Sequence, residues 1–356
     1  MTTSTQKHFS KAATLNNLSR QIKDRELGIA DVDLEEHLDL QSLSHLPQSI
    51  TLKNVLAAVK NDGLAEAYLR GSFSSGDADD YSDIDLFLVV DPSHLEKTFL
   101  QFIDYAKSHY EILSICHDKL VADYGGVGFM ALLKDKVNSR VTQFDLYFCQ
   151  TGGYPKTPLV NSPRIYSRNP DYSVFCEKEP QTRDADAQKL MAHVVSPLDK
   201  TTNDARHELN DLAIAAFIMS KHLKRGQIAR ARNDDHHAVQ LCANLFKQAI
   251  GYTSHQTPLY FADRLVETCI SSGTPVQQKI GSILKNICAN NPSPEQIGDI
   301  TLFIRQMIVS FYPALEEEFR PILNELEISA NPRLAGTNVI RIPQPINREY
   351  REYKVS

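Results

Sequence analysis

The spacing of hydrophobic positions along the first 150 residues alternates between a helical and a strand pattern. Apolar residues recur every three to four positions over residues 51–61 and 95–110, which predicts two amphipathic helices. Shorter apolar stretches bounded by Gly, Pro or Asp predict strands at residues 65–72, 83–90, 111–122, 127–133 and 139–149. Helices that alternate with strands in this way indicate an α/β or α+β domain over residues 51–150.

The pattern changes after residue 150. Residues 151–182 carry Gly, Pro and Tyr in turn-like clusters, which predicts a linker. From residue 183 to 330 nearly every stretch has helical spacing, so we expect an all-α helical bundle domain there. The chain ends are predicted to be an N-terminal helical extension at residues 1–50 and an extended tail at residues 331–356.

Composition narrows the class of protein. The 356 residues hold 38 Lys and Arg against 44 Asp and Glu, a formal charge of -6, which disfavours a long nucleic acid as partner. The six cysteines lie far apart without a C-x-x-C pair, and this is typical of reduced thiols. Because neither a signal-peptide core nor an apolar run of about 20 residues is present, we expect a cytoplasmic protein without a membrane partner.

An acidic pair opens the predicted strand 83–90. Asp83 and Asp85 are two residues apart, so on a strand their side chains project from the same face. Two neighbouring carboxylates repel each other unless a divalent cation neutralises them, and oxygen ligands of this kind suit Mg²⁺. Before the loop, Gly71 allows backbone to approach a phosphate, and Ser72 offers a hydroxyl and an N–H.

A third carboxylate, Asp145, lies in the predicted strand 139–149. Alternation places it with Gln143 on the face opposite Phe144 and Leu146. If this strand lies beside strand 83–90, three carboxylates converge. Such a cluster can hold Mg²⁺ against a nucleoside triphosphate and leave one oxygen to deprotonate a hydroxyl.

Other charged residues have two interpretations each. Arg70 and Arg140 can contact phosphate or form ion pairs with the acidic residues. A solvated surface is favoured over ligand binding for two further groups: the loop aspartates (Asp77, Asp79, Asp80) and the densest basic run (Lys221, Lys224, Arg225, Arg230, Arg232).

The stretch GSFSSGDADDYSDIDLFLVV, residues 71–90, resembles the signature of the DNA polymerase β-like nucleotidyltransferase superfamily. Within it, the stretch is most similar to the antibiotic nucleotidyltransferases that adenylylate lincosamides and aminoglycosides. LKRGQIARA at 223–231 is similar to a turn in the C-terminal domain of that family. The resemblance implies a mixed sheet, a triphosphate site and a Mg²⁺ site, with the triphosphate held by Arg70, Gly71, Ser72 and Ser82 and the metal by Asp83, Asp85 and Asp145.

The activity implied is Mg²⁺-dependent transfer of a nucleoside monophosphate, AMP from ATP, onto a hydroxyl of a small molecule such as an aminoglycoside or lincosamide. Pyrophosphate is the other product, and a homodimer is compatible with this function. Two alternatives stay open. One is a protein or tRNA acceptor, suggested by residues 1–50 and the tail, which have no counterpart in the family. The other is a non-catalytic nucleotide-binding protein.

Overall fold

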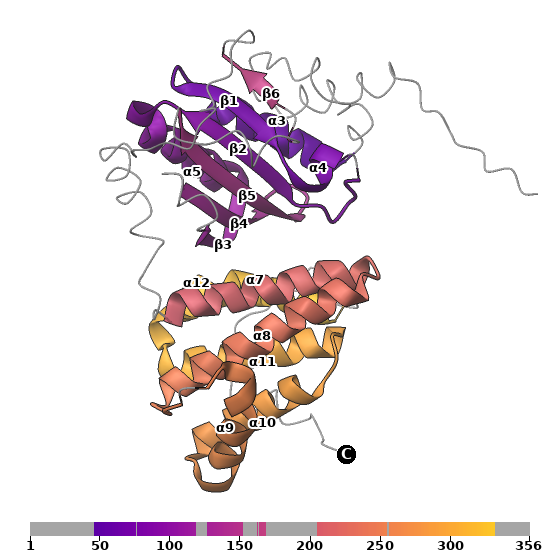
Figure 1. Ribbon diagram of the computed structural model, residues 1–356, viewed down its shortest axis with the longest axis vertical. Coiled ribbons are helices and arrows are strands. Elements are labelled where there is room, and N and C mark those ends of the chain that lie inside the picture. The colour runs from indigo at the N-terminus through magenta and orange to yellow at the C-terminus, as the bar shows by residue number, and fades with distance from the viewer. Residues whose placement is uncertain are drawn as a thin grey trace, which may run out of the picture.

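The computed structural model describes residues 46–75, 77–118, 127–151, 162, 164–168, 205–254 and 256–331. These residues form a sheet covered by helices and, below it in Figure 1, a separate group of helices. The predicted mixed α/β arrangement followed by a helical region is therefore confirmed. Most of the predicted N-terminal extension, most of the linker and nearly all of the tail lie outside the described residues.

The sheet has six strands in the order β3-β4-β5-β2-β1-β6. Its strands are β1 (Leu64–Leu69), β2 (Ile84–Val90), β3 (Tyr110–Asp118), β4 (Val127–Asp135), β5 (Val141–Gln150) and β6 (Arg164–Ser167). β2 and β5 pair in parallel, whereas the other neighbours are antiparallel, so the sheet is mixed. β6 lies within the predicted linker. Its four residues are too few to give an alternating pattern, and pairing with β1 decides its conformation.

Two helices, α3 (Pro47–Val59) and α5 (Leu95–His109), cover one face of the sheet, and a short turn η1 (Pro92–His94) precedes α5. α3 begins earlier than the predicted residue 51 because proline is well suited to a first helical turn, where its missing N–H is not needed. Phe144 and Leu146 of β5 are fully buried in the core beneath these helices. Asp145 and Gln143 therefore face the other side of the sheet, as the alternation predicts.

The C-terminal helices are α7 (Ala205–Lys224), α8 (Ile228–Ala249), α9 (Pro258–Ser272), α10 (Pro275–Ala289), α11 (Pro294–Phe311) and α12 (Glu316–Ala330), with the turn η4 (Pro313–Leu315) before α12. The turn between α7 and α8 contains Gly226 at a φ of 69°, a conformation that favours glycine after a helix. Among the helices of the described ranges, none combines the length and the apolar character that crossing a membrane requires.

The sheet and the helical region share a contact surface along β3 and β4. Leu113, Cys116 and Leu132 are buried in the same apolar core as α7 and α12. Polar contacts border this core: the Ser114 hydroxyl donates to Oδ1 of Asn210 at 3.0 Å, and Lys134 pairs with Glu325 of α12. This surface places the sheet against α7, whose last turn lies beside the predicted site.

Candidate active site

The three predicted carboxylates come together on the sheet face away from α3 and α5. Asp85 on β2 pairs directly with Asp145 on β5 in the parallel register, and Asp83 immediately precedes β2. Burial, then repulsion from Asp83, raises the pKa of Asp85 to about 6. Burial, then repulsion from Asp85 and Asp83, raises the pKa of Asp145 to about 8. The cluster thus holds more negative charge than its surroundings stabilise, as sites that bind cations do.

Gly71 brings backbone into contact with this cluster. It begins the short helix α4 (Gly71–Ser75), which follows β1, and has a φ of 61°. A Cβ atom at this position would lie 2.1 Å from Oδ2 of Asp85. The Arg70 amide, one residue earlier, donates to the Asp85 carbonyl at 3.0 Å. Only glycine satisfies both the conformation and the close approach.

Two further predicted triphosphate ligands lie beside Gly71. The Ser72 hydroxyl is buried and has no hydrogen-bond partner within the described part of the chain. Arg70 lies with its guanidinium carbon 5.8 Å from the ring centre of Tyr147, and its charge opposes the rise in the pKa of Asp85. An unpaired buried hydroxyl is costly, so Ser72 is suited to a ligand oxygen.

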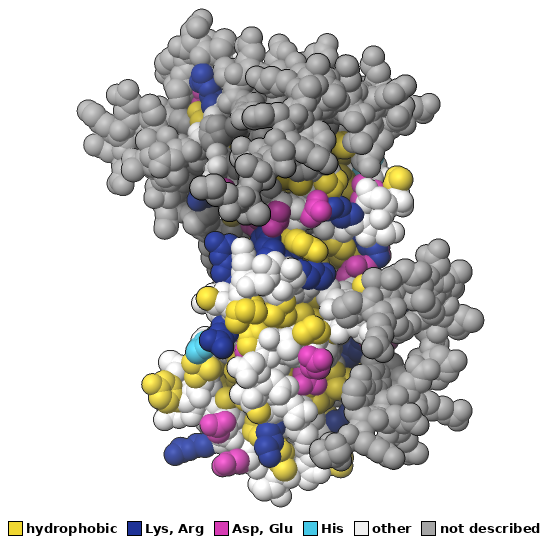
Figure 2. Space-filling view, turned by 90° about the vertical axis from the view of Figure 1, so that its right-hand side faces the viewer, with side chains coloured by type: hydrophobic (Ala, Val, Ile, Leu, Met, Phe, Trp, Pro, Cys, Tyr) yellow, Lys and Arg dark blue, Asp and Glu magenta, His cyan; other side chains and the backbone are white. Residues whose placement is uncertain are grey.

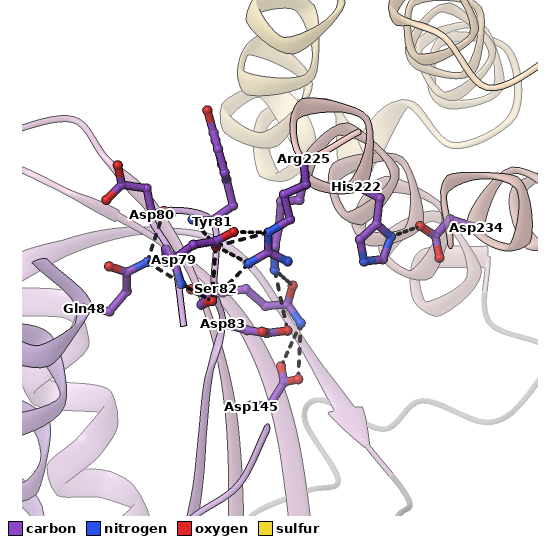
Figure 3. Close-up of polar contacts among 12 residues, drawn as sticks. Gln48, Asp79, Asp80, Tyr81, Ser82, Asp83, Asp145, His222, Arg225 and Asp234 are labelled. Atoms are coloured by element: carbon purple, nitrogen blue, oxygen red, sulfur yellow. Dashed lines mark hydrogen bonds and ion pairs between the residues drawn. The ribbon is translucent and has the colours of Figure 1, made fainter. Parts of the chain in front are cut away.

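The loop that leads to Asp83 is held from below by Gln48 of α3, a residue that the sequence interpretation missed. Its side-chain amide donates to the carbonyls of Asp79 at 3.1 Å, Asp80 at 3.0 Å and Ser82 at 3.1 Å (Figure 3). A single glutamine ahead of a helical pattern carries no signal of such a role. Arg140 also donates to the Asp80 carbonyl, which supports its interpretation as a partner of the acidic loop.

From the other side the loop is held by Arg225, at the end of α7. Its Nε donates to Oδ2 of Asp79 at 2.8 Å and its Nη2 to the Ser82 hydroxyl at 3.0 Å. Burial opposes ionisation of Asp79, but hydrogen bonds from Arg225 and the Tyr81 amide hold its pKa below the usual value. Asp79 and Arg225 are thus paired, not simply solvated as expected. The Ser82 hydroxyl, predicted to bind triphosphate, belongs to this network.

A second cation from α7, Lys221, reaches the carboxylates. Its buried Nζ donates to Oε1 of Gln143 at 2.8 Å and lies 3.5 Å from Oδ2 of Asp83. The Gln143 amide in turn donates to both carboxylate oxygens of Asp145 at 3.2 Å. Burial lowers the pKa of Lys221, although Asp83 and Asp145 oppose this change. Figure 2 shows Lys and Arg side chains gathered where the sheet meets the helical region.

The cluster fits a magnesium ion by its chemistry. Carboxylate oxygens are hard ligands, and Mg²⁺ is commonly held by one or two carboxylates together with substrate phosphates. Within the ranges that the structure describes, no three His, Cys, Asp or Glu side chains are arranged as a complete metal-binding group. The roles of Asp83, Asp85 and Asp145 as metal ligands therefore remain predictions.

A concavity of about 460 Å³ lies on the helical region, lined by His222, Ala229, Arg230, Asn233 and Asp234. Nδ1 of His222 is 2.6 Å from Oδ2 of Asp234, a contact that joins α7 to α8. The close-up in Figure 3 shows this pair on the side of Arg225 away from Asp79.

Comparison with known families gives one match. The model of the nucleotidyltransferase domain matches residues 52–140, about a quarter of the 356-residue chain. The matched range contains Gly71 and Ser72 and the Asp83–Asp85 pair, and ends before Asp145. A search of curated proteins finds no match. Residues 52–140 thus match a nucleotidyltransferase domain, and this match supports a nucleotidyltransferase enzyme.

Proposed function

We propose that this protein is a Mg²⁺-dependent adenylyltransferase that moves AMP from ATP onto a hydroxyl of a small molecule and releases pyrophosphate. The observation that carries this proposal is the direct pairing of Asp85 with Asp145, with the backbone of Gly71 against Asp85. A phosphate-binding turn and a pair of carboxylates at one point are what nucleotidyl transfer requires.

The triphosphate end of the donor binds at the turn after β1. Gly71 leaves room for the Asp85 carboxylate beside the turn, and the hydroxyl of Ser72, which has no partner among the described residues, donates to a phosphate oxygen. The guanidinium of Arg70, already close enough to Asp85 to affect its pKa, adds positive charge on the same side. These three residues fix the donor; Ser82 contributes by holding the loop.

Asp83 and Asp85 are the residues that would hold Mg²⁺, with Asp145 as the third carboxylate. When bound, the ion neutralises charge on the triphosphate and on the carboxylates. Burial, and after it repulsion between the carboxylates, raises the pKa of Asp85 and of Asp145. This supports the assignment, because a bound cation relieves the repulsion.

Asp145 is the residue placed to accept the proton of the acceptor hydroxyl. Gln143 orients its carboxylate through two hydrogen bonds, and burial makes the ionised form a stronger base than an exposed aspartate. As the proton moves to Asp145, the acceptor oxygen bonds to the α-phosphorus and the bond from phosphorus to pyrophosphate breaks. Positioning and charge stabilisation supply most of the rate.

The acceptor we propose is a small hydroxylated molecule, with aminoglycosides and lincosamides as the class that the resemblance suggests. The carboxylates lie where the sheet meets α7, since Lys221 of that helix contacts Asp83. Boundaries between domains are common places for small-molecule sites. The helical region is therefore proposed to select the acceptor.

A pyrophosphate-release assay tests this function. The purified protein is incubated with each nucleoside triphosphate, with Mg²⁺ or with chelator, and with a panel of aminoglycosides, lincosamides and simpler polyols. We expect Mg²⁺-dependent release with ATP that falls at least about 100-fold in Asp83→Ala and Asp85→Ala. Asp77→Asn, an exposed aspartate of the same loop, serves as the matched control.

Two further measurements separate the alternatives. Labelled ATP added to a cell lysate distinguishes the two kinds of acceptor. The label stays with macromolecules if the acceptor is a protein or tRNA, and moves to small metabolites if it is a small molecule. Nucleotide binding without turnover by any acceptor indicates a non-catalytic protein. Undiminished release by Asp83→Ala or Asp85→Ala contradicts the proposed mechanism.

A further inference from the structure

We propose that Arg225, on the helical region, is a positioning residue for the catalytic domain: it fixes the loop at residues 77–83 and thereby the carboxylate of Asp83. The inference rests on the proposed nucleotidyl transfer, since Asp83 matters through that reaction. The helical region then has a role in the reaction that does not depend on the identity of the acceptor.

The contact between Arg225 and Asp79 has a bidentate geometry. Nε and Nη2 of Arg225 both bond to the carboxylate of Asp79, and Nη2 also reaches the Ser82 hydroxyl at 3.0 Å. A guanidinium that makes two parallel bonds to a carboxylate defines orientation as well as distance. Arg225 and Asp79 are 146 positions apart in the chain, so this ion pair joins the helical region to the sheet region of the protein.

Asp79 and Ser82, the two residues that Arg225 contacts, also form hydrogen bonds within the loop. The Asp79 amide donates to the Ser82 hydroxyl at 2.9 Å, and the Asp79 carboxylate accepts from the Tyr81 amide at 2.9 Å. Ser82 is buried and directly precedes Asp83. A shift at Ser82 therefore moves Asp83, and Arg225 prevents that shift from the side opposite Gln48.

Arg225 is itself held in place. Its amide donates to the Lys221 carbonyl at 3.1 Å, so it completes the last turn of α7. Lys221, one turn earlier on the same helix, lies 3.5 Å from Oδ2 of Asp83. One end of α7 thus contacts both the loop and the carboxylate that the loop carries.

The exposure of the two side chains indicates that the Arg225–Asp79 ion pair positions the loop more than it stabilises the folded protein. The Arg225 side chain is 12% exposed, but that of Asp79 is 47% exposed. An ion pair with one solvated partner contributes little to the free energy of folding. Its geometric effect remains, because misplacing a reactive group by about 1 Å can slow a reaction about 100-fold.

The test compares Arg225→Met, Arg225→Lys and Asp79→Asn in the full chain. The amide introduced by Asp79→Asn retains an oxygen for the Tyr81 amide but lacks the charge. Arg232→Met, an exposed arginine on α8, is the matched control. Hydrogen exchange at the amides of the loop and of β2 is measured together with kcat and KM for ATP, and thermal melting checks that each variant is folded.

We expect Arg225→Met to speed exchange in the loop at least about tenfold while β2 is unchanged. Its kcat should fall about 10- to 100-fold with KM for ATP within about threefold of wild type. Arg225→Lys should recover part of kcat, and Arg225→Met combined with Asp79→Asn should be no worse than Arg225→Met alone.

Wild-type exchange in the loop of Arg225→Met, or an equal loss of kcat in Arg232→Met, overturns the inference. If the wild-type protein transfers no nucleotide to any acceptor, the proposed function fails. The exchange measurement still decides whether Arg225 holds the loop.

Discussion

A methyl group on Gly71 would lie 2.1 Å from Oδ2 of Asp85, so the turn after β1 and the carboxylate on β2 fit together only when residue 71 has no side chain. Gly71 begins α4 and Asp85 lies on β2, and neither group can move without disturbing the other. This contact makes residue 71 a test of how closely backbone and carboxylate must approach for activity.

Gly71→Ala should reduce transfer at least about 100-fold, because Asp85 must move to make room. The positive φ adds about 1–2 kcal/mol of strain. Gly251→Ala is the control: its φ is 68°, but nothing lies within 4 Å of the added Cβ. Both variants should lose stability in urea unfolding, and only Gly71→Ala should lose kcat. Equal activity of the two contradicts the role of the contact.

Ser72→Ala should raise KM for the nucleotide about tenfold, as expected when a hydrogen bond to a charged oxygen is lost. Its melting temperature should stay at the wild-type value or rise, because the hydroxyl has no partner in the described part of the protein. Ser74→Ala, which removes a hydroxyl that donates to the Gly71 carbonyl at 2.9 Å, is the neighbouring control. Steady-state kinetics and thermal melting measure these effects. A KM for Ser72→Ala equal to that of wild type would show that Ser72 does not bind the nucleotide.

The metal-free protein should lose stability as pH rises. In the folded state the pKa of Asp145 is raised to about 8 and that of Asp85 to about 6, from an ordinary value of 3.8. The folded protein therefore binds more protons than the unfolded chain between these values, and stability that is complete below the ordinary pKa is lost as pH rises toward 8.

Urea unfolding in chelator from about pH 5 to about pH 8.5 measures this effect. The free energy of unfolding of wild type should fall relative to that of Asp145→Asn, which cannot ionise. Added Mg²⁺ should restore wild-type stability at the upper pH, since the ion favours the ionised carboxylates. Parallel curves for the two proteins contradict the assigned titration.

Gln48→Met should destabilise the protein by about 1–3 kcal/mol, because the buried amide donates to three loop carbonyls. Gln48→Glu should cost more, since it places an acceptor against acceptors. Both should lower kcat through the loop. The measurements are urea unfolding and pyrophosphate release, with Gln278→Met on exposed α10 surface as the control. An unaffected kcat in a folded Gln48→Glu protein argues against this role.

Local pattern was enough to predict β1 to β5 and the acidic pair, but not β6. Alternation along residues 139–149 correctly placed Asp145 on the face opposite Phe144. That Asp145 lies beside Asp85 depends on which strands pair, and strand order is set by packing between distant segments. The parallel register of β2 and β5 places Asp145 opposite Asp85, an arrangement that local pattern left open.

Gln48 and Arg225 could not be predicted in the same way. Each acts on the loop through contacts between segments far apart in the chain, and Gln48 also has an unremarkable sequence environment. Arg225 lies in a basic run beside Gly226, where cations near a helix end are expected for the helix alone. Only the fold shows that one of these cations faces Asp79.

The position of α7 against the loop also bears on engineering. A chimaera that joins the matched nucleotidyltransferase domain to the helical region of another protein would keep every residue of the family match and yet lose Lys221 and Arg225, the two cations of the helical region that contact the acidic loop. Grafting for a new acceptor must therefore carry over the end of α7 with Lys221 and Arg225, and the boundary for such exchanges belongs after this helix.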